Sequence, residues 1–137
     1  MAKLTEAVKK SLDEEIFEYH TIMREIALRK LEIETMREHD DNIGGSSAGI
    51  ISKIPETLVI KYSEDARIQY LEKLKCDVEK LYANATKEQQ SIIENRWLLG
   101  DANTWEEIAY KLHFSVKSMY RKREVILENY ARIKGKL

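Results

Sequence analysis

The sequence predicts an all-α protein, and three observations support this fold class. Apolar residues recur at spacings of three and four, Ser and Thr residues stand where helix N-caps are needed, and no segment sustains the alternation typical of a strand. Three of the five glycines and the only proline lie between residues 39 and 62, which divides the chain. We therefore expect a long helix at 1–38, a linker at 39–61 and a helical domain at 62–137 that ends in a helix-turn-helix at 104–134.

The first predicted helix runs from about Leu4 to Glu38 and carries a narrow apolar stripe. The stripe consists of Leu12, Ile16, Tyr19, Met23, Ile26 and Ile33. A lone helix cannot bury such a stripe against itself, so a partner helix is implied, from this chain or from a second copy. We expect the stripe to be buried and favour a homodimer.

The linker at 39–61 allows two interpretations. Gly44-Gly45-Ser46-Ser47 is either a flexible connector or a nest of backbone amides that could hold a phosphate, although no P-loop pattern follows it. The second half of the linker is expected to pack on the helices as a hydrophobic arm, because it contains Ile50, Ile51, Ile54, Leu58, Val59 and Ile60. The run at 58–60, Leu-Val-Ile, could pair locally as a strand or simply pack.

Local signals place the remaining helices. Ser63 is the expected N-cap of a helix from about Glu64 to Ala85. Capping boxes are predicted at Thr86 and Thr104, because each threonine is followed three residues later by Gln or Glu. Ser115 should cap the last helix, which continues to about residue 134 before Gly135.

The segment from Trp105 to Lys122 has the spacing of a helix-turn-helix, with two short helices joined by a three-residue turn. Ala109 is small where the helices should touch, and His113 occupies a turn position that usually favours glycine because its backbone is left-handed. The residues expected to form the core of this unit are Trp97, Ile108, Leu112, Phe114 and Met119.

The last helix separates into an apolar and a basic face at 100° per residue. The predicted buried stripe is Val116, Met119, Ile126, Tyr130 and Ile133. Residues 117–123 contain four basic residues and no acid, which is either an ordinary solvated face or a DNA-binding surface; its place in a helix-turn-helix favours DNA. The candidate DNA-binding residues are Ser115, Lys117, Ser118, Arg121, Lys122 and Arg123.

These candidates are expected to divide by role. Ser118 and Arg121 point away from the predicted buried stripe and should touch base edges. Lys117 and Lys122 should contact phosphates, whereas Arg123 lies near the stripe and is assigned to a phosphate or to an internal pair with Glu107.

From Thr86 to Lys134 the chain resembles region 4 of bacterial sigma factors, with an "EEIA" helix and a serine-capped, arginine-containing second helix. The linker residues 40–46 (DDNIGGS), Pro55-Glu56, and Arg96-Trp97 before Thr104-Trp105 resemble the RinA and ArpU-type phage transcriptional activators. This resemblance implies promoter binding, activation of late phage genes and possible contact with RNA polymerase. Composition and spacing alone reach only DNA binding.

The bulk properties bound the other function classes. A net charge of -1 gives no signal for nucleic acid across the whole chain, so any such signal is local. The single cysteine, Cys76, excludes a disulfide framework and fits a reducing compartment. The sequence has no run of 18 apolar residues and no signal segment. We therefore expect a cytoplasmic protein without membrane contact. The histidines are scattered, so we expect no catalysis, metal or cofactor.

Two other classes of helical protein are alternatives to a regulator. A DNA-packaging adaptor of the small-terminase type is also helical and oligomeric, but such adaptors usually place the DNA-binding module before the oligomerising helices. A pure coiled-coil scaffold would leave the turn motif unexplained. The target operator and the direction of regulation do not follow from the sequence.

Overall fold

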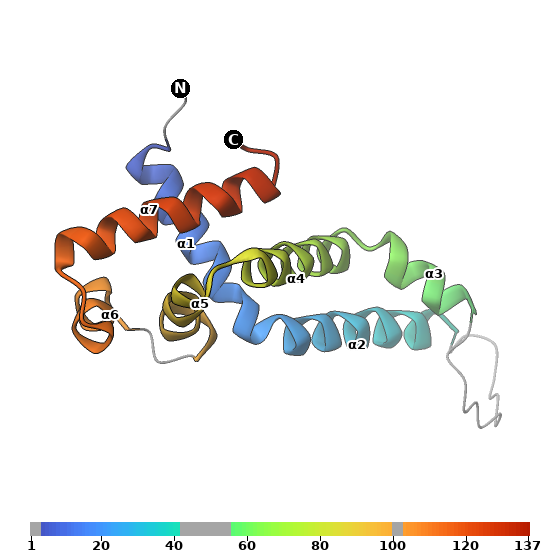
Figure 1. The fold of residues 1–137 in the computed structure, drawn as a ribbon. Helices are drawn as coiled ribbons and strands as arrows, with labels where there is room; N and C mark the ends of the chain where they lie inside the picture. The colour runs from blue at the N-terminus through green and yellow to red at the C-terminus, as the bar shows by residue number, and fades with distance from the viewer. Residues whose placement is uncertain (1–3, 42–55, 100–102) are drawn as a thin grey trace. The chain divides into compact units, whose positions relative to one another are not determined.

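The computed structural model describes residues 4–41, 56–99 and 103–137, with side chains beyond residue 36 omitted from the first range. All regular elements in these ranges are helical, which confirms the all-α fold class (Figure 1). The chain divides into two compact units, one formed by residues 22–73 and the other by residues 1–21 and 74–137.

The predicted N-terminal helix is interrupted. α1 (Glu6–Phe17) and α2 (Ile22–Asp41) are separated by a 3-10 turn, η1 (Glu18–Thr21). The Thr21 hydroxyl donates to the Glu18 carbonyl over 3.1 Å, and His20 Nδ1 lies 2.6 Å from the Phe17 carbonyl oxygen. Such side-chain bonds to carbonyls of the preceding turn compete with regular helix bonding and favour a break. The residues involved are β-branched or aromatic and have modest helix propensity.

The break changes which residues face inward. Ile22 is buried, whereas Met23 is 66% exposed, so the described part of the single chain does not cover Met23 as it covers the rest of the predicted stripe. Leu12, Ile16, Ile26 and Ile33 are buried as predicted, and Tyr19 is partly buried. A 3-10 turn has three residues per turn instead of 3.6, so one helical periodicity of apolar residues does not continue through it.

The 22–73 unit is built from α2, α3 (Glu56–Glu64) and the first part of α4 (Ala66–Asn84). Ile33, Leu58 and Ile68 form its core, and Tyr62 packs against them. α3 begins inside the predicted linker, and the run at 58–60 is helical, with Leu58 buried and its two neighbours exposed. The glycine-rich segment and the three isoleucines of the predicted hydrophobic arm lie outside the described residues.

Asp65 separates α3 from α4, and α4 begins within two residues of the predicted start near Glu64, whereas α3 was not predicted. Its carboxylate accepts a hydrogen bond from the Ile68 amide over 3.0 Å and another from Arg29 Nη2 over 2.7 Å. The Arg29 guanidinium lowers the pKa of Asp65. The prediction that Ser63 is the N-cap is wrong. Its hydroxyl donates to the Ile60 carbonyl over 2.8 Å.

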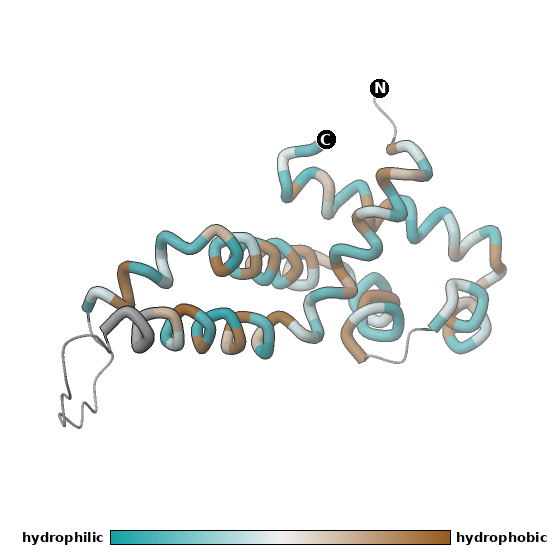
Figure 2. Tube along the Cα trace, turned by 180° about the vertical axis from the view of Figure 1, so that it is seen from behind, coloured by the Kyte–Doolittle hydropathy of each residue, from teal (hydrophilic) through white to brown (hydrophobic). Residues whose placement is uncertain are grey.

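The other unit contains α1, the second part of α4, α5 (Lys87–Ile93), the π-helical turn η3 (Glu94–Leu98), α6 (Trp105–Leu112) and α7 (Val116–Ile133). The predicted N-caps are confirmed, since Thr86 forms a complete capping box and the Thr104 and Ser115 hydroxyls accept from the amides of Glu107 and Ser118. Hydrophobic residues recur along these helices, which is the amphipathic pattern seen in Figure 2.

The predicted core of this unit is confirmed in part. Trp97, Ile108 and Met119 are fully buried. Leu112 and Phe114 are only partly buried. Within α7 the buried face consists of Met119, Ile126, Leu127, Tyr130 and Ala131. Val116 was predicted to belong to it, and this is wrong, since Val116 is 46% exposed at the first position of α7.

Candidate nucleic-acid interface

The turn between α6 and α7 is closed by a Schellman motif. His113 has φ 61° and ψ 41°, the left-handed conformation expected at this position. The amide of Phe114 donates to the Ala109 carbonyl over 2.8 Å, and the amide of His113 to the Tyr110 carbonyl over 3.4 Å. These bonds satisfy carbonyls at the end of α6 and fix the angle at which the chain enters α7.

Small and apolar residues bring the two helices together. Ala109 and Ile108 on α6 and Met119 on α7 are each at most 1% exposed. The Ser115 hydroxyl accepts from the Ser118 amide over 3.1 Å, which fixes the first turn of α7. The result is a helix, a three-residue turn (113–115) and a second helix whose first turns are open to solvent.

The structure places three of the six candidate DNA-binding residues on the exposed surface. Ser115, Lys117 and Arg121 are exposed, and Ser118 is partly buried. Among the residues that the structure describes, neither Lys117 nor Arg121 has an ion-pair partner. Both point to the same side of the helix, one turn apart.

Lys122 is engaged within the protein. Its ammonium forms an ion pair with Glu88 at the start of α5 and lies 4.7 Å from the centroid of the Phe114 ring. Its side chain is 28% exposed. Lys122 therefore holds the turn against α5, a role that sequence periodicity alone did not reveal.

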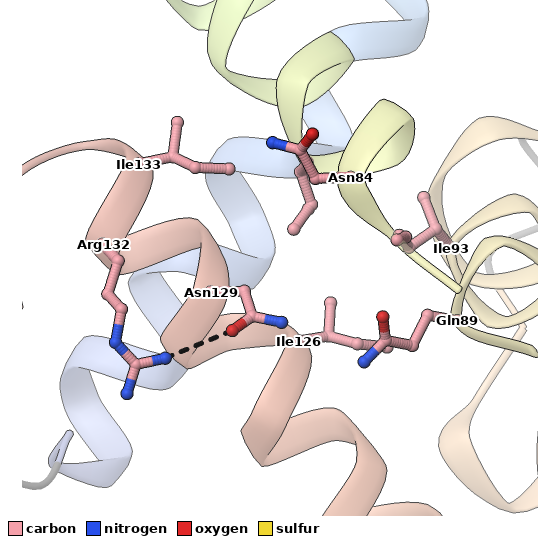
Figure 3. Close-up of a pocket in the computed structure, with 9 residues that line it drawn as sticks. Asn84, Gln89, Ile93, Ile126, Asn129, Arg132 and Ile133 are labelled. Atoms are coloured by element: carbon pink, nitrogen blue, oxygen red, sulfur yellow. Dashed lines mark hydrogen bonds between the residues drawn. The ribbon is translucent and has the colours of Figure 1, made fainter.

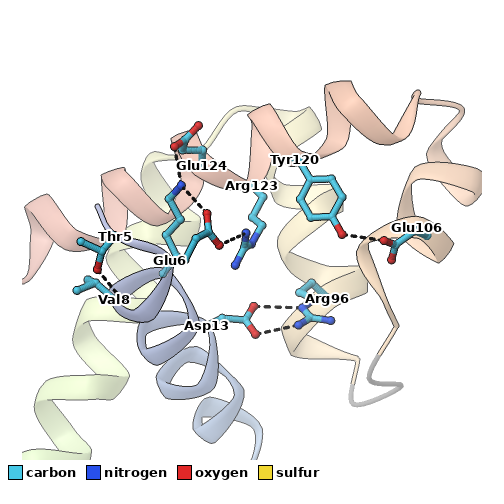
Figure 4. A network of polar contacts seen from close by, with 10 residues as sticks. Thr5, Glu6, Val8, Asp13, Arg96, Glu106, Tyr120, Arg123 and Glu124 are labelled. Atoms are coloured by element: carbon cyan, nitrogen blue, oxygen red, sulfur yellow. Dashed lines mark hydrogen bonds and ion pairs between the residues drawn. The ribbon is translucent and has the colours of Figure 1, made fainter. Parts of the chain in front are cut away.

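Arg123 is also used internally, but its partner differs from the one predicted. The guanidinium lies 3.7 Å from a carboxylate oxygen of Glu6 on α1, and the predicted pair with Glu107 is wrong (Figure 4). The rings of Trp105 and Tyr120 flank it, with centroids 5.8 and 6.0 Å away. With a side chain 15% exposed, Arg123 braces α7 against α1 and α6.

A buried polar network lies behind the turn motif. The Asp13 carboxylate of α1 accepts from Arg96 Nη2 over 2.8 Å and from Trp97 Nε1 over 3.1 Å. Arg96 also donates to the Asn103 carbonyl over 2.6 Å, and its guanidinium lies 4.9 Å from the ring centroid of Trp105. The network connects α1, η3 and the start of α6, so it determines where the turn motif sits in this unit (Figure 4).

A second set of contacts joins α1 directly to α7. Lys9 is buried and forms ion pairs with Glu124 at 2.6 Å and Glu6 at 3.2 Å. The hydrogen bond from Lys9 to Glu124 raises the pKa of the Lys9 ammonium. Glu6 thus pairs with both Lys9 and Arg123, and together with Glu124 it balances the two cations on this side of the unit.

Sequence reasoning missed two side chains at the start of α7. Val116 and Tyr120 are 46% and 40% exposed and stand one turn apart, beside Lys117 and Arg121. The Tyr120 hydroxyl donates to a Glu106 carboxylate oxygen over 2.7 Å, which raises the pKa of Tyr120 and lowers that of Glu106. The position of Val116 at the very start of the helix was a signal for its exposure, because the end of a helix has neighbours on fewer sides than its middle.

A cavity of about 280 Å³ lies between α4, α5 and α7, far along α7 from its first turn (Figure 3). Leu81, Ile93 and Ile126 line its apolar part. Its rim carries Asn129 and Arg132, whose side chains are joined by a hydrogen bond of 3.2 Å. The polar residues that line the cavity are three amides and one arginine. They do not include the acid, base and nucleophile of a catalytic site.

Within the described ranges, no group of three or more His, Cys, Asp or Glu side chains is placed to hold a metal ion. No helix in the same ranges is both long and apolar enough to cross a membrane.

A family model described as "Protein of unknown function (DUF722)" matches residues 8–132. The chain belongs to the DUF722 family. Comparison with curated proteins and with solved structures found no match. The matched range of this DUF722 protein includes α1, which supplies Asp13, as well as the turn motif that Asp13 helps to position.

Proposed function

We propose that this DUF722 protein binds duplex DNA sequence-specifically, with the first turns of α7 in the major groove. One observation carries the proposal: a helix, a three-residue turn and a second helix present Lys117 and Arg121 on an exposed face without an internal partner among the described residues. Cations that are neither buried nor neutralised are available to DNA.

The roles follow from position. Arg121 reads a base edge, since a guanidinium can donate two hydrogen bonds to guanine O6 and N7. Lys117 contacts phosphate, and Ser115 lies at the helix N-terminus, where backbone amides favour an anion. Lys122 and Arg123 support the motif through Glu88 and Glu6 and make no direct contact in this proposal.

The experiment is selection of duplex sites from a random library, followed by titration of variants on the selected site. Arg121→Ala should weaken specific binding by about 5-fold or more, because a bidentate base contact contributes about 1–3 kcal/mol. Arg132→Ala is the matched control, since Arg132 is an exposed arginine at the other end of the same helix, and it should change affinity less than about twofold. Equal effects of the two substitutions would contradict the proposal.

The finer proposal is a cytoplasmic transcription regulator, an activator of late phage genes that acts with RNA polymerase. It is supported by the resemblance of residues 86–134 to sigma region 4 and of the linker to phage activators. Transcription in vitro from promoters carrying the selected site tests it, with Arg121→Ala as the inactive variant. Site-specific binding without any change in transcript level would leave DNA binding intact and refute activation.

A further inference from the structure

The first two turns of α7 expose two columns of side chains. One column is apolar, Val116 and Tyr120, and the other is basic, Lys117 and Arg121. Residues four apart lie on one side of a helix, so each column runs along the helix axis and the two are neighbours. If the basic column faces DNA, the apolar column lies beside it.

Val116 is nearly half exposed at the first position of α7. The contact between α6 and α7 is already closed by Ile108, Ala109 and Met119, which are almost completely buried. A β-branched residue also has lower helix propensity than alanine, so local stability does not favour valine here. The valine at position 116 therefore suits a contact with a ligand better than it suits the packing of the motif.

The side chain of Tyr120, the second residue of the apolar column, is held in place by two neighbours. Its hydroxyl is engaged by Glu106 over 2.7 Å, and the Arg123 guanidinium lies 6.0 Å from its ring centroid. With the hydroxyl occupied, the side chain offers the apolar part of its ring to a ligand. Val116 and the Tyr120 ring together form a small apolar surface next to two free cations.

We propose that Val116, backed by Tyr120, reads the C5 methyl group of a thymine next to the base pair read by Arg121. The thymine methyl is the apolar group at the floor of the major groove, and an aliphatic side chain distinguishes thymine from cytosine by burying it. The inference rests on the proposed function, because it assigns specificity to the same helix.

The test replaces the thymines of the selected site one at a time with uracil, which lacks only that methyl group. One such replacement should weaken binding of the wild-type protein about fourfold, the effect of exposing one methyl-sized group. Val116→Ala should cause a similar loss on the thymine site and should make that same replacement nearly silent. Val125→Ala is the matched control, because Val125 is equally exposed on the same helix and should respond to uracil like the wild type.

The outcomes separate the two proposals. If wild-type protein binds the selected site but no single uracil weakens it, or if the losses from uracil and Val116→Ala multiply, the methyl contact is refuted and DNA binding stands. If no duplex is selected at all, DNA binding and the methyl contact both fail. Unchanged thermal melting of Val116→Ala by circular dichroism ensures that the loss is not caused by unfolding.

Discussion

Replacing Asp13 with alanine should destabilise the unit formed by residues 1–21 and 74–137 by about 3 kcal/mol. The substitution leaves the Arg96 guanidinium, whose side chain is 15% exposed, without its carboxylate, and the indole N–H of fully buried Trp97 without its acceptor. Removing one partner of a buried pair costs roughly 3–5 kcal/mol. We take the lower end, because Arg96 keeps its bond to the Asn103 carbonyl.

The assay is urea unfolding followed by tryptophan fluorescence. Both tryptophans of the chain adjoin the network, with ring centroids 5.6 Å apart, so their emission reports on this unit. A loss of 3 kcal/mol corresponds to a fall in the melting temperature of about 10 °C for a chain of this size. Glu14→Ala, at the neighbouring exposed position of α1, should change stability by less than about 0.5 kcal/mol.

A double variant separates the buried charge from packing. Arg96→Met removes the cation, so Asp13→Ala combined with Arg96→Met leaves no unpaired buried charge and should be less destabilised than the sum of the two single variants. Strict additivity, or a loss for Asp13→Ala no larger than that for Glu14→Ala, would refute the role given to this pair.

Three further predictions concern other parts of the molecule. Phe114→Ala should lower the free energy of unfolding by about 2 kcal/mol, less than a fully buried aromatic residue, because the ring is only partly buried; an unchanged urea midpoint would contradict this. Because the pKa of Asp65 is lowered in the fold, its charge stabilises the fold above about pH 4, and this stability is lost as the pH falls through the lowered pKa. Asp65→Asn should therefore reduce the dependence of the free energy of unfolding on pH at acid pH, whereas the control Glu64→Gln should not. Parallel pH profiles for the two variants would contradict this role of Asp65. If a second copy covers the outer face of α2, Leu31→Asp, at a position 57% exposed, should convert a dimer into a helical monomer by light scattering; an unchanged mass would exclude this face.

Local signals in the sequence were sufficient for most helix ends. Thr86, Thr104 and Ser115 were identified as caps because a cap depends on residues within three positions of it. The left-handed His113 followed from the same kind of local reasoning about a turn. The helix α3 inside the predicted linker was missed, and Ser63 was named as the cap of α4 instead of Asp65, whose carboxylate also binds Arg29, 36 residues away.

Side-chain roles that depend on distant partners could not be predicted from periodicity. Arg123 lies near the buried face of α7, as its spacing indicated, but its carboxylate partner comes from α1 instead of α6. Lys122 was assigned to phosphate because Glu88 could not be placed beside it from sequence. In both cases the spacing located the side chain on the helix, and only the tertiary contacts revealed what it binds.

These internal pairs bear on the kind of DNA binding that the chain could perform. Of the four cations at 117–123, two are neutralised by acids of α1 and α5, in a chain whose net charge is -1. Affinity without sequence preference grows with the number of phosphates neutralised, so a motif with two free cations depends on few phosphate contacts. Under the proposed function, discrimination then has to come from the proposed contacts of Arg121 and Val116 with base edges. A protein that packages DNA of any sequence would gain from keeping all four cations free, whereas a regulator that must leave most of a genome unoccupied would gain from pairing two of them internally. The charge arrangement therefore favours the regulator over the packaging adaptor.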